Sequence, residues 1–192
     1  GILVGADHPG AAFVGLSGSG KTTAVDYLTS KGYPKVYFGG VLLHAMEEAG
    51  IESSWENQDT FRVDIRKREG QDFVVKRIIA QIHELIAAGQ HRIVADGIYS
   101  WDEYKIMKQE FPGELTLIAL VSPRRLRHHR LNVRPERPLT DQEANDRDWH
   151  EIEDIQKGGP IAIADHFIIN DGDEEAFYKD LEAAMSAYFV LL

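Results

Sequence analysis

Residues 15–22 read Gly15-Leu16-Ser17-Gly18-Ser19-Gly20-Lys21-Thr22 and fit the pattern G-x-x-x-x-G-K-[ST]. An apolar stretch, residues 11–14, precedes them, and an amphipathic stretch, residues 23–31, follows. The motif therefore has the strand, loop and helix context that it requires. Glycines let backbone N–H groups wrap around a phosphate chain, because no Cβ blocks the approach and positive φ angles cost little. The sequence predicts a phosphate-binding loop.

The polar residues of this loop have distinct expected roles. We expect Lys21 to reach the β- and γ-phosphates of a nucleotide, and the Thr22 hydroxyl to ligate Mg²⁺. The helix that starts near Lys21 adds the partial positive charge of its N-terminus. The predicted nucleotide contacts in this stretch are Gly15, Leu16, Ser17, Gly18, Ser19, Gly20, Lys21, Thr22 and Thr23.

Length and composition are those of an ordinary globular protein. The 192 residues suit one domain, which we expect to cover residues 1–192. The absence of cysteine excludes disulfides and thiolate chemistry, and a formal net charge of −10 argues against general affinity for nucleic acid. No apolar run approaches the roughly 18 residues of a membrane span, and residues 1–4 are too short for a signal peptide. We therefore expect a cytoplasmic protein that does not contact membranes.

Apolar runs alternate with helical patterns, which is typical of an α/β fold with a parallel sheet and crossover helices. Strands are predicted at residues 11–16, 35–38, 92–96, 115–121 and 164–170. Helices are predicted at residues 21–31, 41–49, 55–69, 72–88, 100–111, 123–132, 140–157 and 173–192. Capping boxes are expected at Ser53 with Glu56, Ser100 with Glu103, and Thr140 with Glu143. Gly158-Gly159-Pro160 is expected to break the preceding helix.

Asp96 ends the third predicted strand and precedes Gly97. In an α/β sheet, ligands bind at the carboxyl ends of the strands. A carboxylate at this place can hold Mg²⁺ through water, or it can orient and deprotonate an acceptor hydroxyl. Alternatively, Asp96 only begins a turn. Beside a phosphate-binding loop, the functional interpretation is favoured, and both functional roles stay open.

A cluster of arginines follows the fourth strand of this acidic protein. Glu136 is the only acid in residues 124–137, which contain Arg124, Arg125, Arg127, Arg130, Arg134 and Arg137. Arginines at helical spacing can surround the equatorial oxygens of a transferring phosphoryl group, and a mobile segment carrying them would exclude water. The pattern favours a lid at residues 124–147, with Arg147 as a further candidate. A solvated basic helix, or an RNA-contacting patch, is the alternative.

Other candidates lie on the acceptor side and after the last strand. Arg62 and Arg66 share a helix face and could bind an anionic acceptor, although pairing with nearby surface acids is equally consistent with the sequence. Asn170 and Gly172 lie in a loop that could bind a nucleotide base through backbone groups. The histidines form no recognisable set of metal ligands.

Over most of its length the chain resembles P-loop small-molecule kinases of the nucleoside monophosphate kinase group. It is most similar there to adenylate-kinase-like and dephospho-CoA-kinase-like proteins. The matching segments are residues 15–22, 38–39, 95–98, 122–131, 147–151, 164–165 and 169–172. The resemblance implies a three-layer P-loop NTPase fold with a five-stranded parallel sheet, helices on both faces and a short lid. It also implies ATP and Mg²⁺ as the donor, and an acceptor held by the helical segment at about residues 40–90.

The acceptor side departs from the pattern of that group. Gly40 stands where the group usually has an acidic residue, and Leu43 and Tyr99 stand where it has arginines that grip the acceptor phosphate. Arg66 remains at a matching position, so Arg62, Arg66 and Tyr99 are the predicted acceptor contacts. These departures argue against AMP as the acceptor.

Two functional hypotheses follow. In the first, the protein is an enzyme that transfers the γ-phosphoryl group of Mg·ATP to a small metabolite, such as a nucleoside monophosphate or dephospho-CoA. Its expected catalytic residues are Lys21, Asp96, Arg127, Arg130 and Arg147, with Thr22 and Asp96 on the metal. In the second, it is a nucleotide-binding regulatory or interaction protein with weak or no kinase activity. The altered acceptor side favours the second hypothesis, and the arginine cluster favours the first.

Overall fold

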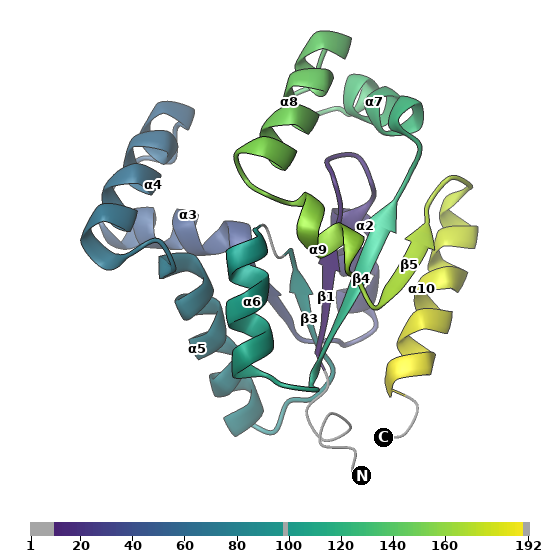
Figure 1. Cartoon of the computed structure of the whole chain (residues 1–192), viewed down its shortest axis with the longest axis horizontal. Helices are drawn as coiled ribbons and strands as arrows, with labels where there is room; N and C mark the ends of the chain where they lie inside the picture. The colour runs from purple at the N-terminus through teal and green to yellow at the C-terminus, as the bar shows by residue number, and fades with distance from the viewer. Residues whose placement is uncertain (1–9, 98–99, 190–192) are drawn as a thin grey trace.

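The computed structural model describes residues 10–97 and 100–189 and contains a parallel sheet flanked by helices (Figure 1). The strands are β1 (Gly10–Val14), β2 (Lys35–Tyr37), β3 (Ile93–Asp96), β4 (Leu115–Val121) and β5 (His166–Ile169). They are ordered β2-β3-β1-β4-β5, and every neighbouring pair is parallel. The register pairs Phe13 of β1 with Asp96 of β3. The phosphate loop therefore begins at the same end of the strands at which Asp96 lies.

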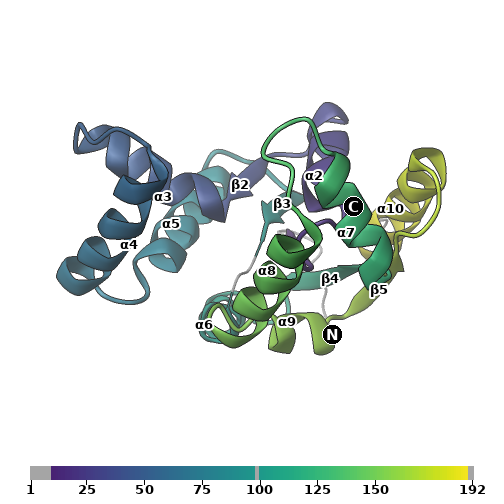
Figure 2. The ribbon, with the colours of Figure 1, turned by 90° about the horizontal axis from the view of Figure 1, so that it is seen from above.

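The helices cover both faces of the sheet, as parallel strands with buried faces require. They are α2 (Lys21–Ser30), α3 (Phe38–Glu48), α4 (Trp55–Glu69), α5 (Phe73–Ala87), α6 (Trp101–Glu110), α7 (Arg124–Val133), α8 (Asp141–Glu153), α9 (Gly158–Ala162) and α10 (Glu174–Phe189). Helices α3, α4 and α5 gather at the β2 end of the sheet, and α10 lies near the β5 end (Figure 2). Helices α7 and α8 lie above the carboxyl ends of the strands (Figure 1).

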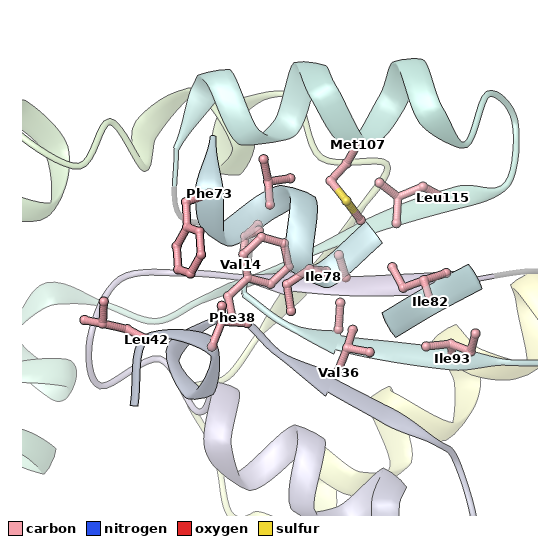
Figure 3. Packing of buried hydrophobic residues seen from close by; sticks show 14 of the residues in the cluster. Val14, Val36, Phe38, Leu42, Phe73, Ile78, Ile82, Ile93, Met107 and Leu115 are labelled. Atoms are coloured by element: carbon pink, nitrogen blue, oxygen red, sulfur yellow. The ribbon is translucent and has the colours of Figure 1, made fainter. Parts of the chain in front are cut away.

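Alternation along the strands builds two cores. In β1, Ala11 and Phe13 point to the face covered by α2 and α10, whereas Ala12 and Val14 point to the opposite face. That second face packs against α3, α5 and α6, and Figure 3 shows part of this cluster around Ile78. The carboxyl ends of the strands therefore lie between two packed layers of helices. None of the helices in residues 10–97 and 100–189 is long and apolar enough to cross a membrane.

The five predicted strands and the fold class are confirmed, and three local predictions are wrong. Helix α3 begins at Phe38 rather than at residue 41, because Gly39 and Gly40 enter the helix beneath the ring of Tyr37. Helix α8 ends at Glu153, and the Gly-Gly-Pro stretch opens α9. A proline is tolerated there because a first helical turn needs no N–H from it.

The capping predictions give a mixed result. Thr140 and Glu143 form the expected capping box. The box predicted at Ser100 is only half formed, since Ser100 accepts from the Glu103 amide while the Glu103 carboxylate accepts from the Ser100 hydroxyl. The box predicted at Ser53 is wrong by one position, since Ser54 is the N-cap of α4 and accepts from the Asn57 amide. Two adjacent serines offer the same chemistry, so the local pattern could not choose between them.

Candidate functional site

The loop between β1 and α2 needs its glycines for two reasons. Gly18 and Gly20 have φ angles of 85° and 101°, a region that L side chains rarely adopt. A Cβ at Gly18 would lie 2.7 Å from the carbonyl oxygen of Arg127, and one at Gly20 would lie 2.5 Å from Nδ2 of Asn170. The loop is therefore packed tightly against α7 and the end of β5.

Three consecutive carbonyls of the loop are held from outside by side chains. Arg127 Nη1 donates to Ser17 O at 3.1 Å, and Arg130 Nη1 donates to Gly18 O at 3.0 Å. Asn170 Nδ2 donates to Ser19 O at 3.0 Å. The C=O and N–H of one trans peptide point in opposite directions. The amides of residues 18 and 20 belong to the same peptides as the Ser17 and Ser19 carbonyls. Because these carbonyls are held by side chains on one side of the loop, the two amides point to the opposite side.

A buried ion pair fixes Arg127 in this position. Its two Nη atoms donate to the two carboxylate oxygens of Asp148 at 2.7 and 3.0 Å, and both side chains are buried. His128 Nε2 lies 2.8 Å from Asp148 Oδ2. Burial alone would raise the pKa of Asp148, but these hydrogen bonds hold that pKa below its usual value. The pair links α7 to α8 and both helices to the loop.

Lys21 and Asp96 influence each other at the carboxyl edge. Burial lowers the pKa of Lys21, and the charge of Asp96 opposes that shift. Burial likewise raises the pKa of Asp96, opposed chiefly by Lys21. A desolvated carboxylate of this kind gains from a nearby cation. The fold thus brings Lys21 and Asp96 near each other at the carboxyl ends of the strands, as predicted.

The residues of the loop fit a nucleotide phosphate with its magnesium ion. Ser19 Oγ is buried and has no hydrogen-bond partner among the described residues, so it is a polar atom that a phosphate oxygen would satisfy. Thr22 follows Lys21 in the first turn of α2, on the side of the loop. The described part of the chain has no cluster of three metal-binding side chains. Mg²⁺ beside phosphates needs none, because it keeps waters and takes one or two protein oxygens.

Arg147, Glu151 and Lys157 form a second polar cluster beside the loop. Arg147 Nε donates to Ser17 Oγ at 2.9 Å. The Ser17 amide donates to Glu151 Oε1 at 3.0 Å, and Lys157 Nζ contacts the other oxygen of Glu151. Burial and the charges of Lys21 and Arg147 lower the pKa of Lys157 to about 6, whereas the charge of Asp96 acts in the opposite direction.

The acceptor side is more open. A hollow of about 420 Å³ is lined by Gly40, Leu43, His44, Glu47, Ile51 and Ser53. A Cβ at Gly40 would lie 2.9 Å from the Tyr37 ring, so an acidic side chain there would displace that ring. Burial and the charge of Asp96 raise the pKa of Tyr37, which therefore lies near that carboxylate. Tyr37 had not been predicted as a site residue.

The predicted acceptor contacts are only partly brought together. Arg62 and Arg66 lie on the same face of α4, next to buried Phe61 and Ile65. Arg66 acts on Glu103 of α6, whose pKa is raised by burial and lowered in part by Ser100 and Arg66. Tyr99 lies outside the described residues, so its predicted role stays a prediction.

Three other residues singled out from the sequence lie near the ends of β5 and α7. Asn170 is buried, and its carbonyl already accepts from Ser122 Oγ at 2.6 Å and from Arg130 Nη2 at 2.9 Å. Its contacts support the loop, whereas Gly172 is exposed after β5. Arg134 donates to the carbonyl of Arg137 at the end of α7, so it does not join Arg127 and Arg130 on the loop.

Relatives of this chain were found by sequence comparison. No family model matches. A UPF0200 protein of Thermococcus gammatolerans is 33% identical over 171 residues, covering 88% of this chain and 89% of that protein. A UPF0200 protein of Sulfurisphaera tokodaii is 34% identical over 174 residues, covering 89% and 92%. The chain belongs to the UPF0200 family.

Solved structures relate this UPF0200 member to small kinases by fold. TT1252 from Thermus thermophilus has a TM-score of 0.61 and 18% identity, covering 96% of this chain and 98% of its own. Shikimate kinase from Bacteroides thetaiotaomicron has a TM-score of 0.59 and 13% identity, covering 93% and 97%. A gluconokinase from Sinorhizobium meliloti has a TM-score of 0.54 and 13% identity, covering 94% and 93%. At these identities the likeness concerns the fold alone, which is the expected α/β fold of P-loop kinases.

Sequence reasoning missed the anchoring residues of this UPF0200 site. The sequence marks Asp148 and Glu151 only through a family resemblance, and it predicts Lys157 as the end of a helix. The available signal was a set of charged residues next to the predicted lid, to which the sequence assigns no individual role. Contacts of this kind become visible only when residues more than a hundred positions apart are packed together.

Proposed function

We propose that this protein is a phosphotransferase that moves the γ-phosphoryl group of Mg·ATP to a small acceptor. The observation that carries the proposal is the shared edge of β1 and β3, where the phosphate loop, Lys21 and Asp96 meet. Loop amides and Lys21 would bind the phosphates, while Arg127 and Arg130 keep the loop in shape. Thr22 and Asp96 would hold Mg²⁺, which when bound neutralises charge on the phosphate chain.

Asp96 also has the position of a group that orients the acceptor hydroxyl. It lies at the carboxyl end of β3, beside Lys21, and Tyr37 is close enough for its pKa to respond to the Asp96 charge. The acceptor would approach from the side of α3 and α4, with Arg62, Arg66 and Tyr99 as candidate contacts. Arg147, on Ser17 Oγ, is the arginine best placed to reach the transferring group.

The hollow beside α3 supports an acceptor without a strongly bound phosphate. Its lining combines apolar Leu43 and Ile51 with His44, Glu47 and Ser53, and contains no arginine. The same observation favours the second candidate function, a nucleotide-binding regulatory protein with weak or no transfer activity. In that case the loop would bind ATP in a Lys21-dependent way while no acceptor accelerates its turnover.

The deciding experiment measures ADP release from Mg·ATP with a panel of acceptors and a control without acceptor. The panel contains AMP, CMP, UMP, GMP, dTMP, dephospho-CoA and shikimate, the last because a shikimate kinase shares the fold. Lys21→Ala should lower the acceptor-dependent rate by roughly 100- to 1,000-fold. Exposed Lys31→Ala, at the other end of α2, is the matched control and should leave the rate unchanged.

If no acceptor raises the rate above the control, a broader set of hydroxylated metabolites is tested next. Failure of that set as well, with ATP binding retained, would favour the regulatory function. Absence of Lys21-dependent ATP binding would overturn both candidates.

A further inference from the structure

Glu151 is a carboxylate buried against the phosphate loop. Only 1% of the residue is exposed, although it belongs to α8, which lies far along the chain from the loop. Its Oε1 accepts the Ser17 amide at 3.0 Å, and its second oxygen contacts Nζ of Lys157. An anion of the protein itself therefore bonds to a backbone amide of the loop that is expected to bind phosphate.

The surroundings of Glu151 are those of a phosphate site. Lys157 is itself buried and lies close enough to Lys21 and Asp96 for their charges to act on it. Arg147 donates to the side chain of the same Ser17 whose amide binds Glu151. The anion is thus bonded to a backbone amide and a lysine, with Arg147 on the same serine and Lys21 near Lys157, and groups of these kinds bind phosphate.

The backbone after α8 is shaped to bring this pair together. Glu151 and Lys157 are six residues apart, so a continuous helix would place them on different faces. Instead α8 ends at Glu153, and Gln156 takes a left-handed conformation with φ 60°. The Lys157 amide then donates to the carbonyl of Glu151 at 3.0 Å, and the two side chains meet. A non-glycine residue seldom adopts this conformation, because its Cβ crowds the backbone.

A purely structural tie is the competing explanation. A buried ion pair often stabilises a fold no better than apolar side chains of similar volume. The Glu151 pair also differs from the Arg127–Asp148 pair in its target. Arg127 holds a loop carbonyl, whereas Glu151 takes a loop amide. The contact of Glu151 with the Ser17 amide therefore competes with any phosphate that binds the same amide.

We propose that the Glu151 carboxylate occupies the place of a γ-phosphate, and that only a nucleotide with a γ-phosphate displaces it. In this proposal, which rests on the proposed nucleotide binding, the γ-phosphate of ATP takes the place of Glu151 on the Ser17 amide. Lys157 and Arg147 then contact that phosphate. This position on the Ser17 amide is assigned to the γ-phosphate because Lys157 lies near Asp96, on the side of the proposed transfer. ADP is one phosphate shorter and leaves Glu151 in place, so Glu151 sets the preference between ATP and ADP.

The test compares the affinities for ADP and for a non-hydrolysable ATP analogue, both with Mg²⁺, by calorimetry. Glu151→Gln keeps an oxygen for the Ser17 amide and removes the charge. We expect it to tighten binding of the ATP analogue by about tenfold or more, because a like charge next to phosphate is lost. ADP binding should stay unchanged and reports that the variant is folded. Exposed Glu153→Gln, on the same helix, is the matched control.

Lys157 is tested in the same background. Adding Lys157→Met to Glu151→Gln avoids leaving an unpaired buried charge. It should reverse the gain for the ATP analogue while leaving ADP binding unchanged, since Lys157 would have become a ligand of the terminal phosphate. If Glu151→Gln changes both affinities equally, or neither, Glu151 is only a structural tie and the proposal is wrong.

A measurement on the unaltered protein covers the case in which the variants do not fold. Amide hydrogen exchange of residues 151–158 should differ between the ADP complex and the complex with the ATP analogue. Identical exchange in the two complexes would overturn the displacement. If neither nucleotide binds at all, the failure lies with the proposed function instead.

Discussion

On the side of the phosphate loop, charged side chains are buried and bonded to backbone groups, whereas on the side of α3 and α4 they are half-buried or exposed. Arg127, Asp148 and Glu151 are all buried, and each is bonded to the loop or to a residue that holds it. On the other side, Leu43 is 40% exposed and lines an open hollow. In terms of the proposed function, the donor side is thus held by fixed polar contacts, whereas the acceptor side has few of them.

This difference fits what each side has to recognise. A triphosphate has the same shape in every nucleotide, so a rigid set of amides and cations can be built in advance. An acceptor site that is open and half apolar leaves selection to groups that come together when the acceptor binds. Substitutions on the two sides should therefore have effects of very different size on stability.

The largest effect is expected from Arg127→Ala. The substitution leaves the Asp148 carboxylate buried without its bidentate partner, which costs about 3–5 kcal/mol of unfolding free energy. Urea unfolding measures the loss. Exposed Arg125→Ala on the same helix should change stability by less than about 0.5 kcal/mol. Equal effects of the two variants would show that the donor side is not preformed by this pair.

Asp96 lies between the two sides, and its loss should affect turnover more than stability. For Asp96→Asn we expect kcat to fall roughly 100-fold, the lower end of the range for a proton-transferring group. Binding of ADP should change little, because the loop amides and Lys21 remain. The exposed Asp171→Asn is the control. Unchanged turnover would remove Asp96 from the transfer step and leave it as a turn residue.

The next effect depends on pH. The folded pKa of Asp148 is lower than its unfolded value of about 3.9, because Arg127 and His128 bond to the carboxylate despite its burial. Its contribution to stability is therefore fully present above that value and is lost as pH falls through the folded pKa. Asp148→Asn should destabilise the protein by about 2 kcal/mol at pH 7.

The difference between wild type and Asp148→Asn should shrink as the pH falls below about 4, where the unfolded chain begins to bind a proton that the folded protein does not yet bind. Urea unfolding at pH 7, 5, 4 and 3 follows this change, with exposed Asp146→Asn as the reference. A difference that stays constant over this range would show that the charge of Asp148 does not carry the stabilisation.

The fold and the core of the donor site could be predicted because their signals are local. Residues 15–22 carry the whole loop motif in one continuous stretch. The apolar run at residues 115–121 indicates a strand that is buried on both faces. The approach of Asp96 to Lys21 follows from the rule that parallel strands end at one edge. Each of these inferences needs only neighbouring residues and a general property of α/β sheets.

The second polar cluster could not be predicted, for physical reasons. Glu151 and Ser17 are 134 positions apart, and no periodicity connects them. The contact between Glu151 and Lys157 depends on the left-handed conformation of Gln156, which glutamine seldom adopts. Gly40 had been read as a missing acidic residue, and the structure shows that the Tyr37 ring fills that space.

The smallest effect on stability is expected from Leu43→Arg. Leu43 is exposed at the hollow, so the change should shift the unfolding free energy by less than about 0.5 kcal/mol, in contrast to Arg127→Ala. An arginine there would add a cation to a lining that has none, and it should lower KM for phosphate-bearing acceptors such as AMP relative to uncharged ones. Leu43→Gln, with similar length and no charge, separates charge from size. If Leu43→Arg destabilises the protein as strongly as Arg127→Ala, the acceptor side is as tightly built as the donor side, and the contrast between them fails.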